Sequence, residues 1–222
     1  MQLARRPGAG WIVLIGGGEF SFGATEAIDR AWLDKTADGA IGFVPAASGS
    51  TEYGGHLATY LQESFGRTAE TIPIYRPRDA RRGKNSARIA AASTVYLGGG
   101  VTDRLLEAFR DTPALDALTA KLEAGGVVVA IAAAAQSLGV VARSLFGGGS
   151  IAGFDWLEGG VVETNFDPSH DRRLRRLLEH PQARWGLGLP AGSAVLLGPD
   201  DEVETIGKVF VLPDSEGDLT VC

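Results

Sequence analysis

The sequence predicts an α/β protein in three layers, with a mainly parallel sheet between helices and antiparallel strands at the C-terminal edge of the sheet. Short apolar runs alternate with Gly-rich or small-residue turns and segments of helical spacing over residues 11–138. The 222 residues are 45% hydrophobic and 22% charged, values that fit one large domain spanning residues 1–222. The stretch Gly125–Gly139 joins the longest β-branched run directly to small residues, and we expect it to be central.

Within this stretch, Val127–Ile131 is an unbroken apolar run with three valines, which indicates a strand buried on both faces. Ala132–Ala135 has high helix propensity, so we expect a sharp turn into a helix over Ala133–Leu145. A strand-turn-helix of this kind carries the nucleophile in many α/β enzymes. Here the place of the Ser or Cys is held by Ala132.

The N-terminal part begins with a predicted strand at Trp11–Ile15, followed by the turn Gly16-Gly17-Gly18-Glu19. This turn matches neither G-x-G-x-x-G nor the Walker A pattern and lacks the lysine, so a close-packed turn is favoured over a phosphate site. The elements expected next are a helix at Ala24–Leu33, a strand at Ala40–Ala46, a helix from Ser50 or Thr51 to about Phe65, and a short strand at Thr71–Ile74.

The middle of the chain opens with a basic run at Arg76–Arg88, where a solvated surface is favoured over contact with an anion or an acidic partner. The elements predicted after it are a strand at Ser93–Leu97, the turn Gly98–Gly100, and helices at Asp103–Phe109 and Pro113–Glu123 with Thr112 as N-cap. Ligands of parallel sheets bind where the strands end, so the Gly16–Gly18, Gly98–Gly100 and Ala132 turns are expected to share one edge.

The C-terminal part is predicted to contain an irregular stretch around Gly147–Gly149, a short strand at Gly160–Glu163 and a basic helix at Asp167–His180. Short strands joined by turns follow at Leu187, Val195–Leu197, Glu202–Ile206 and Lys208–Leu212. We expect these strands to be antiparallel and to extend the edge of the parallel sheet.

The composition argues for a cytoplasmic protein. Cys222 is the only cysteine, so no internal disulfide and no cysteine metal site are expected, and Met1–Gly10 has no apolar region typical of a signal peptide. No apolar run reaches the roughly 18 residues of a membrane span. The net charge of −6 argues against a nucleic-acid partner, and no spacing of His or carboxylates indicates a metal; no cofactor is expected.

The order of the motifs resembles the cyanophycinase and dipeptidase E family of serine peptidases. Their flavodoxin-like fold is similar to that of class I glutamine amidotransferases. The segments that carry the resemblance are Ile15–Glu19, Phe43–Ser48, Val95–Phe109, Gly125–Gly139, Gly153–Phe166, Gly186–Leu197 and Val203–Leu212.

This resemblance implies that the site chemistry is lost. The nucleophilic Ser of the family falls on Ala132 and the catalytic His on Asn165, while its polar pair falls on Val101 and Thr102 and its acidic pair on Pro190 and Ala191. A methyl group cannot attack a carbonyl, and an amide has no basic nitrogen to take a proton. Several site positions differ while the scaffold matches, which favours natural loss over a single mutation.

Other groups near this site are expected to have ordinary structural roles. The N–H groups after Gly99 and Gly100 and near Ala133 are expected to be able to form an oxyanion-type pocket. Ser137 is expected to bond back to a helix carbonyl rather than act as a nucleophile. Thr102 and Thr164 are interpreted as formers of local hydrogen bonds and His170 as a solvated histidine. His56 and His180 lie on predicted helices with no nearby partner in the sequence.

Two classes of function therefore stay open. The favoured one is a non-catalytic relative that keeps the pocket for binding, at positions Gly99, Gly100, Val101, Thr102 and Ala133. The alternative is a peptidase or amide hydrolase with a rearranged site, acting on short or acidic peptides. The expected partner is a small molecule or a short peptide, without nucleic acid or membrane, and a homodimer is compatible with the sequence.

Overall fold

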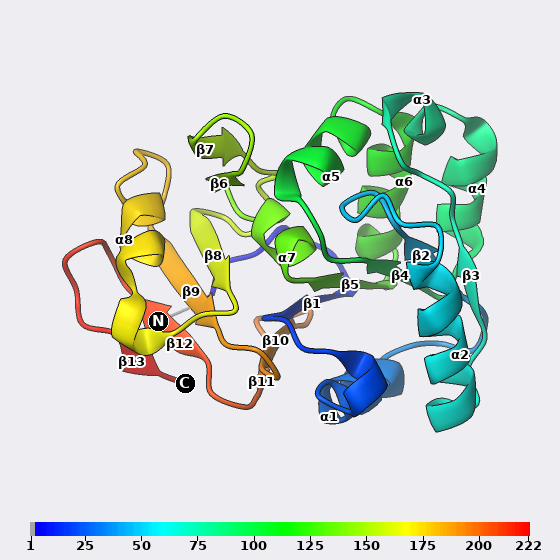
Figure 1. Ribbon diagram of the computed structural model, residues 1–222, viewed down its shortest axis with the longest axis horizontal. Helices are drawn as coiled ribbons and strands as arrows, with labels where there is room; N and C mark the ends of the chain where they lie inside the picture. The colour runs from blue at the N-terminus through cyan, green and yellow to red at the C-terminus, as the bar shows by residue number, and fades with distance from the viewer. Residues whose placement is uncertain (1–2) are drawn as a thin grey trace.

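A seven-stranded sheet organises the computed structural model, which describes residues 3–222 (Figure 1). Its order is β11-β10-β1-β5-β4-β2-β3, and β5 occupies the middle position with all five residues buried. Strands β1 to β5 pair in parallel, whereas β10 and β11 are antiparallel. The strand bounds are β1 (Trp11–Ile15), β2 (Ile41–Val44), β3 (Ala69–Thr71), β4 (Thr94–Leu97), β5 (Val127–Ile131), β10 (Ala194–Leu197) and β11 (Val203–Ile206). The predicted fold class and the predicted central strand are confirmed.

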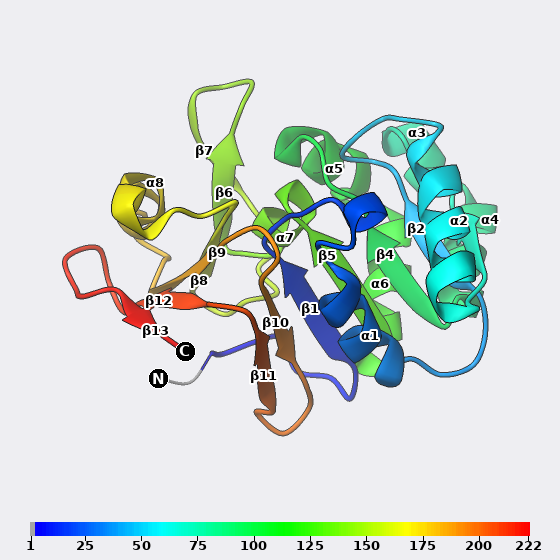
Figure 2. The same cartoon turned by 60° about the horizontal axis from the view of Figure 1, so that its bottom comes forward.

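Helices cover both faces of this sheet (Figures 1 and 2). Their bounds are α1 (Glu26–Asp34), α2 (Tyr53–Phe65), α3 (Pro77–Ala80), α4 (Gly83–Ala91), α5 (Thr102–Phe109), α6 (Pro113–Glu123), α7 (Ala133–Ser137) and α8 (Arg172–Leu178). Alternate residues of β5 point into two apolar cores on opposite faces of the sheet. Val127 and Val129 belong to the core that contains Trp32 of α1. Val128 belongs to the core that contains Phe109 of α5. This explains why the strand is apolar without interruption.

A second sheet corrects the expected C-terminal arrangement. It has the order β13-β12-β9-β8 and contains β8 (Gly160–Thr164), β9 (Trp185–Leu189), β12 (Phe210–Leu212) and β13 (Thr220–Val221). Only β10 and β11 extend the parallel sheet, and β8 pairs with β9 in parallel. The second sheet has its own apolar core, in which Leu174 and Leu178 of α8 and Phe210 and Leu212 of β12 are buried together.

The predicted extent of the helix over Ala133–Leu145 is also wrong, because α7 ends at Ser137. Gly139 then lies against β8, where a β-carbon on it would be 2.8 Å from the Gly160 carbonyl, and the Val140 N–H donates to that carbonyl. The β-branched pair that follows favours extended backbone. The chain accordingly forms a hairpin of β6 (Val141–Ser144) and β7 (Gly149–Ala152). Of the stretch expected to be irregular, Gly147 and Gly148 lie in the turn, and Gly149 is the first residue of β7.

Smaller differences concern element ends. The third strand is Ala69–Thr71 instead of Thr71–Ile74, and the basic run forms α3 and α4. The helix expected over Asp167–His180 begins as a 3-10 turn at Pro168–His170, and a similar turn lies at Phe20–Phe22. Thr112 is the N-cap of α6 as predicted and accepts the Leu115 N–H at 3.4 Å. Met1 and Gln2, the first two residues of the segment expected to lack a signal peptide, lie outside the described residues.

Across residues 3–222, no helix has both the length and the apolar character needed to span a bilayer. The same residues include no cluster of three or more His, Cys, Asp or Glu that could hold a metal ion.

Candidate functional site

Ala132 occupies the turn between β5 and α7 in a conformation that L-residues rarely adopt, with φ 52° and ψ −117°. Its N–H donates to the Ile15 carbonyl at 2.9 Å, and its carbonyl accepts the Gln136 N–H at 3.1 Å. The Ala132 methyl lies against the next turn, because a β-carbon on Gly99 would be 3.4 Å from it. This is the tight strand-turn-helix that the small residues predict.

Asn165 follows β8 and also has a positive φ, 49°. Its N–H donates to the Gly16 carbonyl at 2.7 Å. Ala132 and Asn165 are therefore bonded to consecutive carbonyls at the end of β1, which lies beside α7 and the segment after β8 (Figure 1). The structure thus brings together Ala132, Asn165 and the Gly16–Gly18 and Gly98–Gly100 turns.

The Gly98–Gly100 turn is held by its main chain. A β-carbon on Gly100 would stand 2.4 Å from the Ala47 carbonyl, and the Val101 N–H donates to that carbonyl at 2.9 Å. The donor expected after Gly100 is consequently occupied, and this part of the expected oxyanion-type pocket is wrong. The N–H groups of Gly100 and Ala133 meet no hydrogen-bond acceptor within residues 3–222.

A buried polar bridge crosses the site behind these turns. The Thr102 hydroxyl donates to the Gln136 Oε1 at 3.3 Å and lies 3.4 Å from the Ala133 carbonyl, while the Gln136 Nε2 donates to the Thr164 hydroxyl at 2.9 Å. These bonds connect the first residue of α5 with α7 and with the last residue of β8. Thr102 and Thr164 thus form local hydrogen bonds, as expected, and Gln136 is a bridging residue that the sequence analysis missed.

The comparisons with known proteins concern the family and the fold. The sequence model of Peptidase family S51 matches residues 12–204. The chain belongs to Peptidase family S51. The structure is similar to a peptidase from an acI-B1 actinobacterium, with a TM-score of 0.76 at 18% identity over 96% of each chain. It is also similar to a putative peptidase E protein from Listeria monocytogenes EGD-e, with a TM-score of 0.65 at 16% identity, covering 89% of this chain and 98% of that one. A comparison with curated proteins found no match.

The resemblance drawn from the motifs is thereby confirmed at the level of the S51 family. Pro190, where the resemblance leads us to expect the family's acidic pair, lies beside the site through its backbone, because a β-carbon on Gly16 would be 2.1 Å from the Pro190 carbonyl. That carbonyl accepts the Ser193 hydroxyl at 2.8 Å. Pro190 and Ala191 accordingly supply turn geometry and no carboxylate.

The hydroxyl of Ser137 is committed to the backbone of this S51 chain. It donates to the Ala134 carbonyl at 2.6 Å, and Ser137 is fully buried. The expected back-bond to a helix carbonyl is therefore confirmed. Among the histidines, His56 is exposed, and exposed His170 pairs with Asp167 at 2.8 Å. Hydrogen bonds from Ser169 and His170 lower the pKa of Asp167 to about 2.

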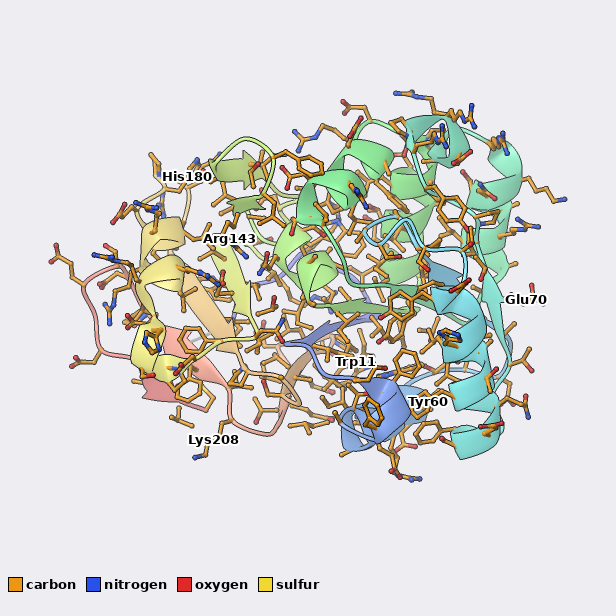
Figure 3. The ribbon with its side chains drawn as sticks, viewed as in Figure 1. Trp11, Tyr60, Glu70, Arg143, His180 and Lys208 are labelled. Atoms are coloured by element: carbon orange, nitrogen blue, oxygen red, sulfur yellow. The ribbon has the colours of Figure 1, made fainter. Side chains whose placement is uncertain are left out.

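Glu163 is a second residue that the sequence analysis missed. It is 4% exposed on β8, its Oε2 meets no hydrogen-bond partner among residues 3–222, and its Oε1 lies 3.8 Å from Arg173. Burial raises the pKa of this carboxyl, and the charges of Arg143 and Arg173 oppose the shift. Arg143 belongs to β6 and is labelled in Figure 3. Glu163 and Asn165 line a cavity of about 430 Å³ that extends along α8. The available signal was a charged residue directly after the apolar pair Val161-Val162.

Tyr53 is a third missed residue. Its ring lies against the Gly98 turn, where a β-carbon would be 3.2 Å from Cε1, and it stacks on Phe20 with centroids 5.9 Å apart. Burial raises the pKa of Tyr53 to about 12, although a hydrogen bond from the Gly99 backbone opposes the shift. The phenol is thus a neutral polar group beside the turn that contacts Ala132.

Proposed function

We propose that this protein is a non-catalytic member of Peptidase family S51 that binds a small molecule or a short peptide at the Ala132 turn. The observation that carries the proposal is the backbone of Ala132. It has the strained geometry that presents a nucleophile in related folds, with a methyl group in place of the nucleophile. Such a conformation costs about 1–3 kcal/mol and persists only where the surroundings enforce it.

The surrounding side chains support the absence of a replacement nucleophile. The hydroxyls of Ser137 and Thr102 are buried and donate to protein acceptors, and the Thr164 hydroxyl accepts from Gln136. Asn165 stands where the family's base is expected, and its amide cannot accept the proton of a serine. Nucleophile and base act as a unit in serine peptidases, so their joint replacement argues for a binding function.

The decisive test exposes purified wild-type protein to a fluorophosphonate probe and to a panel of short acidic peptides, with an active serine hydrolase as positive control. We expect no covalent adduct and no hydrolysis. The Ser137→Ala variant is the matched control. Turnover that occurs in wild type and disappears in Ser137→Ala would establish a rearranged hydrolase and contradict the proposal.

The binding part has its own test. The same peptides, and the amino acids that compose them, are screened for a rise in the thermal midpoint of the wild-type protein. The Ala132→Leu variant fills the space beside Gly99, so a ligand held there is expected to lose the effect. A ligand that stabilises both proteins equally would contradict binding at this turn.

The cellular location and the absence of a cofactor are part of the same proposal. We infer a cytoplasmic protein that works without a cofactor, a nucleic acid or a membrane. The single cysteine and the net charge of −6 support this.

A further inference from the structure

The surface formed by α3 and α4 is strongly positive on a chain whose net charge is −6. Residues 76–88 contain six cations and one carboxylate, so this segment carries +5 and the rest of the chain −11. All six cations are exposed, and Figure 3 shows side chains with nitrogen tips around α3 and α4 that point away from the body of the molecule. We call these six residues the α3–α4 basic surface: Arg76, Arg78, Arg81, Arg82, Lys84 and Arg88.

The single carboxylate of this segment neutralises little of the charge. Asp79 is 7% exposed, and its carboxylate lies 3.9 Å from Arg78 and 3.8 Å from Arg82, at the outer limit of an ion pair. Among residues 3–222, no carboxylate lies within 4 Å of the other four cations. The excess positive charge therefore faces solvent.

The second basic helix, α8, is compensated by its surroundings. The Arg175 Nη2 lies 2.8 Å from the Asp171 carboxylate, and Arg173 lies 3.8 Å from Glu163. Two of its four arginines thus have a carboxylate partner of their own. The lack of such partners distinguishes the α3–α4 basic surface from a basic helix elsewhere in the same chain.

The positions of these charges are unfavourable for the free protein. Lys84 and Arg88 are four residues apart on α4, where like charges repel each other. The first turn of α4 contains no acidic residue, and its N-cap is Arg82, so cations stand at the positive end of the helix dipole. An anionic partner would relieve both repulsions.

We propose that the α3–α4 basic surface binds an acidic segment of a partner protein. The sequence alone favours a solvated surface here, whereas the lack of ion pairs in the structure favours the alternative, contact with an acidic partner. Guanidinium groups bind carboxylates through two parallel N–H···O bonds, and five of the six cations are arginines. Helix α4 has nine residues and is about 13 Å long, the reach of about four extended residues, so a short run of Asp or Glu covers it.

A nucleic acid is a poorer fit to this surface. Its phosphates continue along the strand, and beyond residues 76–88 they would meet a chain that carries −11. A short acidic segment of a protein ends where the positive charge ends. Its complementarity to the α3–α4 basic surface is therefore complete, and that of a long polyanion is partial.

Fluorescence anisotropy of a labelled octaglutamate peptide, titrated with the full chain in about 50 mM salt, tests this proposal. Exposed ion pairs are individually weak, so we expect a dissociation constant on the order of 10–100 μM. We expect binding at least tenfold weaker at about 300 mM salt, because exposed charges are screened. A neutral octaserine peptide is expected not to bind.

Two double variants locate the peptide. Arg81→Glu with Lys84→Glu reverses two cations that have no carboxylate partner and is expected to weaken binding at least tenfold. Arg172→Glu with Arg176→Glu is the matched control, because it makes the same change of charge at exposed positions of α8 and is expected to alter binding less than threefold. Ala132→Leu is expected to have no effect, since the α3–α4 basic surface is independent of the candidate site.

Circular dichroism melts establish that each variant is folded before its binding is compared. A wild-type chain that does not bind octaglutamate overturns the proposal, and so does equal weakening by the two double variants. Loss of binding in Ala132→Leu would place the peptide at the candidate site instead. A single-stranded oligonucleotide that displaces the peptide at a lower concentration than unlabelled octaglutamate would identify a nucleic-acid surface and contradict the assignment to a protein partner.

Discussion

Gly17 lies so close to Asn165 that a β-carbon on Gly17 would stand 2.4 Å from the Asn165 Oδ1. The contact joins the turn after β1 to the segment after β8, two parts of the chain that are nearly 150 residues apart. A glycine fits here because Gly17 has a φ of 134°, which L-residues rarely adopt, and because a β-carbon would force the Asn165 side chain to shift. The turn after β1 and the segment that contains Asn165 are therefore in direct contact.

Gly17→Ala is therefore expected to destabilise the protein by about 2 kcal/mol, mainly through the unfavourable φ, with a smaller cost for shifting the exposed Asn165 side chain. Urea unfolding measures the change. Gly23→Ala is the matched control, since Gly23 has a φ of 74° and no atom within 4 Å of an added β-carbon. We expect the control to lose only about 1 kcal/mol. Equal losses would show that the contact with Asn165 contributes nothing.

Ala132→Gly is expected to raise stability by about 1 kcal/mol, because glycine adopts the conformation at φ 52° and ψ −117° without strain. Ala134→Gly changes the neighbouring helix, where ordinary helical geometry favours alanine, and is expected to lower stability by about 1 kcal/mol. Thermal or urea unfolding distinguishes the two signs. A loss of stability in Ala132→Gly would mean that the methyl packs better than its strain costs.

Glu163→Gln tests the buried carboxyl through pH. Its folded-state pKa is raised above the ordinary value of 4.5, so its contribution to stability is present below that pH and is lost as pH rises through the folded-state value. The stability of wild type relative to Glu163→Gln is expected to fall as pH increases from about 4 to 8. Unfolding by urea at each pH provides the comparison, with the exposed Glu158→Gln as control. A difference that stays constant or grows with pH would contradict the raised pKa.

Restoring a single catalytic group is expected to leave the protein inactive. Ala132→Ser lacks a base and Asn165→His lacks a nucleophile, and the two groups act as a unit. The double variant Ala132→Ser with Asn165→His is expected to show weak hydrolysis of short acidic peptides, limited by the altered Val101-Thr102 and Pro190-Ala191 positions. Fluorophosphonate labelling and peptide hydrolysis measure this. Strong activity in either single variant would contradict the assignment of these two positions.

The central strand was predictable because its signal is local. Val127–Ile131 contains five apolar residues and is buried on both faces, so composition alone indicates its place. The alanines after it predict a tight turn for the same reason. The proximity of Ala132 and Asn165 could not be predicted from local patterns, because no local pattern relates the end of β5 to the end of β8. Their expected proximity came from the order of the family's motifs.

The end of α7 was not predictable in this way. It depends on Gly139 meeting the Gly160 carbonyl, a contact between segments about twenty residues apart, and helix propensity extends past that point. The second sheet was missed for a related reason, since β9 and β12 are short apolar segments that fit either sheet. The cavity at Glu163 likewise needs α8 to close over β8, which the sequence of either element leaves unspecified.

The bonds that hold Ala132 and Asn165 in place use only main-chain groups, the Ile15 and Gly16 carbonyls. Every amino acid except proline carries the N–H donor that each bond requires. Mutation can therefore exchange either side chain and leave the framework standing. In such a fold, substitutions that remove catalytic side chains leave the backbone structure intact. The fold can therefore persist after an activity is lost and can acquire another function.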